Sequence, residues 1–209
     1  IPAEVGNMTS VKRILLRGNQ LTGQLPSSLG LLPNLVELDL SDNQLSRTIP
    51  TTIGYATNLE QLTLNDNRLT GGIPAMHVFS LVTFFVQDNK LTGMVIDTFW
   101  DPQDVGLTHV DISNNLFSGP IPSEIFHMPN ISSVALSGNC FSGSLSEELC
   151  LADSLEVLSL NGLGASRGCK DAVKSIFSSD VVLYNTLEGS LPDCVWHLPN
   201  LRILHATGI

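Results

Sequence analysis

One sequence feature limits what this chain can fold into: a pattern of about 24 residues repeats along almost its whole length. Most copies fit the form LxxLxLxxNxLxGxIPxxLxxLxx, in which x is any residue. Copies begin at residues 11, 35, 59, 81, 107, 131 and 155, and an eighth begins at residue 201. A copy this short cannot bury its own apolar face, so it must stack on its neighbours. The sequence therefore predicts a solenoid.

Each part of the repeat predicts its own local structure. The LxL segment alternates apolar and polar residues, as a short half-buried strand does, so its leucines should face the stack. The glycine permits the backbone to turn back, and the proline lacks an amide donor and suits a turn. An asparagine side chain both donates and accepts hydrogen bonds, so it can satisfy backbone groups at the corner after the strand. We expect a buried asparagine ladder that consists of Asn19, Asn43, Asn67, Asn89, Asn115 and Asn139.

The motifs LTGQLP, LTGGIP, FSGPIP and LEGSLP carry a family resemblance. With them, the chain resembles the plant-type leucine-rich repeat family, which includes extracellular receptor ectodomains and secreted pectinase-inhibiting proteins. The resemblance implies an α/β repeat fold: a right-handed leucine-rich-repeat solenoid with a parallel β-sheet on the concave face and short 3-10 or irregular convex segments. The motif is weaker at RTIP, GMVI and GSLS in the second, fourth and sixth copies, which should soften the turns there without breaking the register.

The pattern predicts one domain, a single repeat array over residues 1–209 with about eight copies. Both ends fall within a copy, so we expect the chain to be part of a longer array. The seventh copy has 46 residues, and its excess forms an insertion at 163–184. The insertion follows the end of a strand, at the lip of the concave face. Loops longer than about 12–15 residues are often functional, so this one is either a binding element or a tolerated insertion.

The composition excludes several functions. The formal net charge of −10 disfavours nucleic acid, which binds basic surfaces. No apolar run has the roughly 18 residues of a membrane span, so any membrane attachment needs a span outside this chain. Motifs for a catalytic nucleophile, a metallohydrolase or a phosphate-binding loop are missing, so we expect no enzyme activity and no cofactor. The cysteines and histidines lack the spacing of a metal site. The oligomeric state is left open.

Outward positions on the concave face are the candidate binding residues. In the second to fifth copies they are mostly acidic, with no lysine or arginine, which favours a basic partner. The other interpretation is that SDN and NDN are ordinary repeat consensus at a solvated edge. A basic group in and beside the insertion would bind an anionic part of the ligand. The candidates are Glu37, Asp39, Glu60, Asp66, Phe85, Asp88 and Asp111 on the concave face, and Arg167, Lys170, Lys174, Arg202 and His205 in or beside the insertion.

The four cysteines all lie in the last third of the chain. Their even number and clustering favour two disulfides over free thiols or a metal site, and therefore an oxidising compartment. Their repeat positions favour the pairs Cys140–Cys169 and Cys150–Cys194 among the three connectivities that four cysteines allow.

Two sequons point the same way, toward an extracellular or cell-surface location. Asn7 in NMT and Asn130 in NIS are acceptors for N-linked glycans if the chain is secreted.

We expect a non-catalytic recognition module, a fragment of a receptor-like or adhesion protein that binds a peptide, protein or glycan. Two other interpretations stay open. One is a secreted inhibitor of a cell-wall-degrading hydrolase. The other is a structural, ice-binding or wall-associated protein, which would use a column of hydroxyl residues: Thr22, Ser46, Thr70, Thr92, Ser118 and Ser142.

Overall fold

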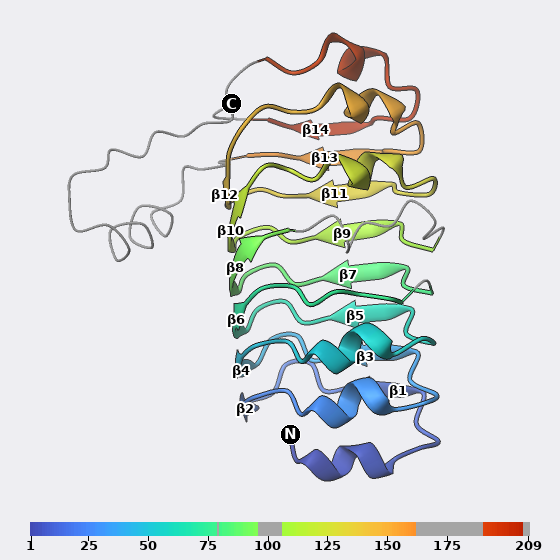
Figure 1. Cartoon of the computed structure of the whole chain (residues 1–209), viewed down its shortest axis with the longest axis vertical. Coiled ribbons are helices and arrows are strands. Elements are labelled where there is room, and N and C mark those ends of the chain that lie inside the picture. The colour runs from blue at the N-terminus through green and yellow to red at the C-terminus, as the bar shows by residue number, and fades with distance from the viewer. Residues whose placement is uncertain (79, 96–105, 162–189, 207–209) are drawn as a thin grey trace, which may run out of the picture.

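A computed structural model describes residues 1–78, 80–95, 106–161 and 190–206. The chain forms a stack of coils in three layers: a first sheet, a second sheet, and a row of 3-10 helices (Figure 1). The N-terminal helix η1 (Ala3–Asn7) lies at one end of the stack, and β14 (Ile203–His205) lies near the other. No helix within the described ranges is long and apolar enough to cross a membrane.

The first sheet has eight parallel strands in the order in which their coils stack, as the repeat predicts. Each LxL segment forms a strand because its middle residue turns inward while both flanking residues turn outward. Leu38, for example, is fully buried and lies opposite Ile14 and Leu62 in the neighbouring strands. The strands are β1 (Arg13–Leu15), β3 (Glu37–Asp39), β5 (Gln61–Thr63), β7 (Thr83–Phe85), β9 (His109–Asp111), β11 (Ser133–Ala135), β13 (Val157–Ser159) and β14.

The second sheet is a feature that the sequence analysis did not predict. Its six parallel strands lie along one lateral side of the stack, at the left in Figure 1. Most begin directly after a ladder asparagine, where the repeat places a buried apolar residue between two outward ones. The strands are β2 (Thr22–Gly23), β4 (Gln44–Arg47), β6 (Arg68–Gly71), β8 (Lys90–Met94), β10 (Leu116–Gly119) and β12 (Cys140–Phe141).

The 3-10 helices follow the proline of the repeat. The ring fixes φ, and the missing amide proton is one that the first turn does not use. In the GSLS motif Ser146 takes the place of proline, and its Oγ accepts a hydrogen bond from the Glu148 amide (3.2 Å). A side-chain cap therefore compensates where we expected a softened turn. The other helices are η2 (Ser27–Leu31), η3 (Thr51–Tyr55), η5 (Ser123–His127), η6 (Glu147–Leu151) and η7 (Asp193–His197).

The three layers enclose one continuous apolar core along the stack. Its largest fully buried side chains are Phe84, Phe117, Phe126 and Phe141. The buried polar residues among those described are Ser41 and five of the ladder asparagines.

Asn67 illustrates how the ladder works. Its Nδ2 donates to the carbonyl oxygen of Leu40 in the preceding coil (2.9 Å) and to that of Leu64 in its own coil (3.1 Å). Its Oδ1 accepts from the amide of Leu45 (2.9 Å). The prediction of a buried, backbone-bonded ladder is confirmed for Asn43, Asn67, Asn89, Asn115 and Asn139.

For Asn19 the prediction of burial is wrong. This residue is exposed, and its amide donates to Leu16 and Arg17 within its own coil. The reason is its place in the stack: β1 is the edge strand of the first sheet, so no strand of a preceding coil lies within reach among the described residues.

A disulfide joins η6 to η7. It links Cys150 and Cys194, whose Cα atoms are 5.5 Å apart, and confirms that predicted pair. Cys140 is also disulfide-bonded. Its expected partner Cys169 and the insertion at 163–184 lie outside the described residues.

Candidate ligand-binding surface

Two rows of outward side chains cover the first sheet. Because the strands pair in register, the members of a row lie side by side, about 4.8 Å apart from strand to strand. The row from the strand starts is Arg13, Glu37, Gln61, Thr83, His109, Ser133, Val157 and Ile203. The row from the strand ends is Leu15, Asp39, Thr63, Phe85, Asp111, Ala135, Ser159 and His205.

Ion pairs occupy the two ends of this surface. They are Arg13–Glu37 (2.5 Å), Arg17–Asp42 (2.9 Å) and Arg202–Glu156 (3.4 Å), measured between nitrogen and oxygen. Exposed pairs of this kind add little to stability. They do mean that Glu37 and Arg202, two of the candidate binding residues, already have a partner within the protein.

The centre of the surface is nearly neutral. From Gln61 to Ser159, the two rows contain one carboxylate, Asp111, and one histidine, His109. The other members have hydroxyl, amide or small apolar side chains, and Phe85 is the one aromatic ring among them. The centre therefore offers apolar contact and hydrogen bonding more than charge, although the sequence favoured an acidic strip.

Asp111 is held by its own turn. Its Oδ1 accepts hydrogen bonds from the amide (2.9 Å) and the hydroxyl (2.5 Å) of Ser113. Burial raises the pKa of Asp111, the bonds from Ser113 oppose that rise, and the nearby Asp88 carboxylate adds to it. Asp39 accepts the same two bonds from Ser41. One oxygen of each carboxylate is thus committed to the local turn.

The acidic column at the corner has a backbone explanation. Asp66 and Asp88 have φ values of 53° and 55°, in the left-handed region. That region favours glycine, asparagine and aspartate over other residues, so the turn selects the residue type without any ligand. Six coils have such a residue at this corner in the described ranges: Gly18, Asp42, Asp66, Asp88, Asn114 and Gly138.

Metal ligation finds little support in the described ranges. Possible ligand atoms of Glu147, Cys150 and Cys194 lie within 4.8 Å of one another, but the two sulfur atoms are joined in the disulfide.

The repeat identifies the family. Models of the leucine-rich repeat match residues 7–70 and 106–128. One similar solved structure is the leucine-rich-repeat ectodomain of the Arabidopsis thaliana membrane receptor kinase GASSHO1/SCHENGEN3 in complex with CASPARIAN STRIP INTEGRITY FACTOR 2; identity is 26%, coverage is 97% of this chain and 25% of that one, and the TM-score is 0.78. The chain is a plant-type leucine-rich repeat protein.

Two further solved structures resemble this leucine-rich repeat chain. The ectodomain of the Arabidopsis receptor kinase HAESA in complex with an IDA peptide hormone ligand is 31% identical, with 77% of this chain and 27% of that one covered and a TM-score of 0.72. A plant ice-binding protein is 26% identical, with 78% and 60% covered and a TM-score of 0.59. The chain thus spans about a quarter of each receptor ectodomain. Among curated protein sequences, none matches it.

The leucine-rich repeat places most of the candidate residues around the first sheet. Those in the two outward rows are Glu37, Asp39, Phe85, Asp111 and His205. Those beside the rows are Glu60 and Arg202, directly before strands β5 and β14, and Asp66 and Asp88 at the corner. Three more, Arg167, Lys170 and Lys174, lie outside the described residues, so their role stays a prediction.

The sequon asparagines have different surroundings. Asn7 is exposed at the end of η1. Asn130 is exposed too, but it occupies the repeat position of Asn34, Asn58 and Asn200. The amides of those three donate to a carbonyl of the preceding coil, each at 2.8 Å, and form a second ladder that the sequence analysis missed. Glycosylation at both sites stays a prediction.

The neutral members of the two rows were missed as candidates, although their outward positions were readable from the repeat. The candidates were chosen by their charge, and small hydroxyl and apolar side chains give no such chemical signal. Among the missed residues are Gln61, Thr63, Thr83, Ser133, Ala135, Val157, Ser159 and Ile203.

Proposed function

We propose that this chain is a non-catalytic recognition module that binds an extended peptide or protein segment across the first sheet. The observation that carries the proposal is the neutral centre of the two outward rows, with Phe85 in the middle and paired charges at both ends. Aromatic side chains are preferred anchors in protein interfaces. An uncharged floor also avoids the cost of desolvating unpaired charges when a ligand covers it.

We also propose that the module works outside the cell or at its surface, as part of a larger receptor-like protein. A disulfide joins η6 to η7, and disulfides persist in oxidising compartments. The similar receptor ectodomains in complex with a peptide hormone and an integrity factor support the same assignment.

A second candidate is ice binding, suggested by the similar plant protein and by the hydroxyl column. Thr22, Ser46, Thr70, Thr92 and Ser118 all lie in strands of the second sheet. The same strands also carry charged side chains, which a regular hydroxyl array for ice would lack. We therefore place this function second.

A display screen tests the first proposal. Peptides that bind the chain from a random library are measured again against Phe85→Ala and His109→Ala. The matched control is Tyr55→Ala, an exposed aromatic on η3, away from the first sheet. We expect affinity to fall by about tenfold or more for Phe85→Ala, as for a typical anchor residue, and to stay unchanged for Tyr55→Ala. Equal affinity for all variants, or no peptide retained, would contradict the proposal.

A further inference from the structure

The neutral centre of the first sheet contains one charge without a partner. Asp111, at the end of β9, is the one carboxylate there, and it forms no ion pair with any described residue. Two acidic side chains nearer the ends of the sheet are neutralised, because Glu37 pairs with Arg13 and Glu156 pairs with Arg202. Asp111 is therefore a negative charge that nothing in the described part of the protein balances.

The groups closest to Asp111 leave one of its oxygens available. Its Oδ1 accepts both hydrogen bonds from Ser113, and Oδ2 has no hydrogen-bond donor among the described residues. Burial raises the pKa of Asp111, and the nearby Asp88 carboxylate raises it further. His109, on the same strand, directs its Nδ1 to the Thr108 hydroxyl (2.6 Å) and not to the carboxylate.

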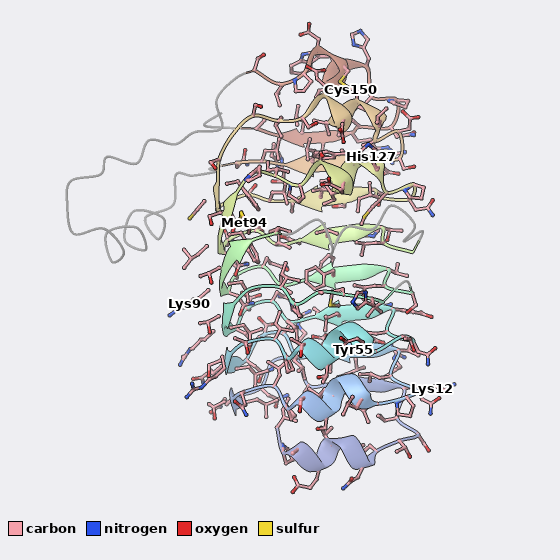
Figure 2. The ribbon with its side chains drawn as sticks, viewed as in Figure 1. Lys12, Tyr55, Lys90, Met94, His127 and Cys150 are labelled. Atoms are coloured by element: carbon pink, nitrogen blue, oxygen red, sulfur yellow. A yellow bond between two sulfur atoms is a disulfide. The ribbon has the colours of Figure 1, made fainter. Side chains whose placement is uncertain are left out.

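The lysines and arginines of the described ranges lie elsewhere. Among the described members of the two outward rows Arg13 is the only one, and it is bonded to Glu37 at the N-terminal edge of the sheet. Figure 2 shows Lys12 toward the N-terminal end of the stack and Lys90 on its lateral side, both away from β9. A positive group beside Asp111 must therefore come from beyond the described residues.

Phe85 gives the position next to Asp111 an aromatic face. The two residues lie opposite each other in β7 and β9, which are parallel and about 4.8 Å apart, and both point outward. Their neighbours on either side, Thr63 and Ala135, have short side chains. A cation within about 6 Å of a ring centroid is attracted to the ring face. A cation above this pair would therefore contact the ring and the carboxylate together.

Gln87 adds an acceptor that lacks a donor. It follows Phe85 by two residues, so its side chain leaves the same face of the sheet. Its Oε1 is buried and has no hydrogen-bond partner among the described residues. A buried acceptor is costly to leave unsatisfied, and this one gains a donor when the side chain turns outward to a ligand. Phe85, Gln87 and Asp111 thus combine an aromatic face with acceptors, which suits a ligand that brings N–H donors and positive charge.

We propose, on the basis of the peptide-binding function above, that the bound peptide carries an arginine or lysine side chain that lies on the Phe85 ring and pairs with Asp111. A peptide that covers the centre removes water from Asp111, and covering an unpaired carboxylate is strongly unfavourable. A cation on the ligand removes this cost, and its attraction to the carboxylate strengthens as water is excluded. An uncharged or acidic peptide offers no such compensation, so Asp111 and Phe85 together select the ligand.

Peptide selection followed by calorimetry tests the cation site. Peptides that the parent chain retains from a random display library are synthesised with acetylated and amidated ends, so that only their side chains carry charge. We expect an arginine or lysine at a shared position. Replacing it with its uncharged analogue, citrulline or acetyl-lysine, should lower the affinity for the parent by about tenfold or more. The same replacement should change the affinity for Asp111→Asn by less than about twofold, because that variant lacks the charge to be paired.

Asp39→Asn is the matched control for Asp111→Asn. Asp39 lies in the same row and accepts the same two bonds from Ser41, but its neighbours in register are Leu15 and Thr63, with no aromatic ring. Asparagine keeps an oxygen that accepts these bonds, and thermal melting verifies that both variants fold. We expect the selected peptides to bind Asp111→Asn at least about tenfold more weakly than the parent, and Asp39→Asn less than about twofold more weakly.

The outcomes separate the cation site from peptide binding itself. Peptides that lose affinity for Phe85→Ala, but share no arginine or lysine or bind Asp111→Asn as tightly as the parent, would overturn the cation site and leave peptide binding standing. Equal losses in Asp39→Asn and Asp111→Asn would indicate attraction by overall charge and would overturn it too. If no peptide is retained, or Phe85→Ala binds as tightly as the parent, the proposed function fails and the cation site fails with it.

Discussion

Each buried ladder asparagine serves backbone groups of two coils at once, which makes it sensitive to substitution. Asn67→Leu leaves the Leu45 amide without an acceptor and removes one of the two side-chain amides, those of Asn43 and Asn67, that donate to the Leu40 carbonyl. We expect a loss of about 1–3 kcal/mol in the free energy of unfolding, the usual cost of unsatisfied buried polar groups. Urea denaturation measures it.

Asn19→Leu is the matched control for this prediction. Asn19 is exposed, and its amide donates only to carbonyl groups of its own coil, those of Leu16 and Arg17. When the amide is removed, water can donate to these carbonyls in its place. The loss should be clearly smaller than for Asn67→Leu. Equal urea midpoints for the two variants would show that the ladder does not depend on contact between coils.

Arg47 is a position where stability should rise on mutation. In Arg47→Gly, the left-handed backbone no longer carries a Cβ, so we expect a gain of about 1 kcal/mol. The reverse case is Gly93→Ala, where an added Cβ would meet nothing within 4 Å and only backbone strain remains. The free energy of unfolding of Gly93→Ala should fall by a similar amount. A drop in melting temperature for Arg47→Gly would contradict the strain argument.

Asp111 should make stability depend on pH. Its folded-state pKa is raised above the ordinary 3.8, mainly by burial, so this group's contribution is fully present below pH 3.8 and is lost as the pH rises through the folded-state pKa. Asp111→Asn mimics the protonated form and can still accept the bonds from Ser113. Its melting temperature should exceed that of the parent at pH 7, by a margin that vanishes below pH 3.8. A margin that does not change with pH would contradict this.

At the scale of elements, the first sheet was predictable because its signal is local and repeated. Leu38 and Leu62 each sit between two polar residues, and that alternation alone defines a strand. The second sheet was not predictable in this way. In Thr22–Gly23 the glycine reads as a turn, and its φ of 83° agrees with that reading. Pairing with the next coil, a tertiary effect, makes such segments strands.

The candidate site was likewise predictable only in part: the local repeat predicts some of its features, and contacts between coils decide the others. Outward positions such as Phe85 and Asp111 follow from the repeat register. What the register cannot give is the partner of each side chain, because that depends on lateral neighbours from other coils. The Arg13–Glu37 pair and the left-handed turn at Asp66 emerged only from the stacked structure.

Close packing of the 3-10 helices depends on glycine. A Cβ on Gly30 in η2 would overlap the backbone of Thr52 and Ile53 in η3, and a backbone segment cannot move aside without separating the coils. Gly30→Ala should therefore cost about 1–3 kcal/mol or more. The neighbouring Leu31→Ala, at a side chain that is 65% exposed, should change stability by less than about 0.5 kcal/mol. Equal urea midpoints would contradict the role of Gly30 in stacking.

At the scale of the whole molecule, charge divides the solenoid into surfaces of different character. The first sheet pairs its arginines with acids and keeps a neutral centre. The second sheet has three exposed cations, Arg47, Arg68 and Lys90, and none of them forms an ion pair with another described residue.

The disulfide ties the last coils together across the segment that contains the insertion. Cys150 and Cys194 are 44 residues apart in sequence, and the bridge limits the freedom of that loop in the unfolded chain. Cys150→Ser with Cys194→Ser should cost about 2–4 kcal/mol. Since each coil of a solenoid contacts only its neighbours, hydrogen exchange should accelerate in η7 and β14 and stay unchanged in β3 and β5. Uniform acceleration along the stack would mean that the coils unfold as one unit, and unchanged exchange in η7 would mean that the stack holds the last coils without the bridge.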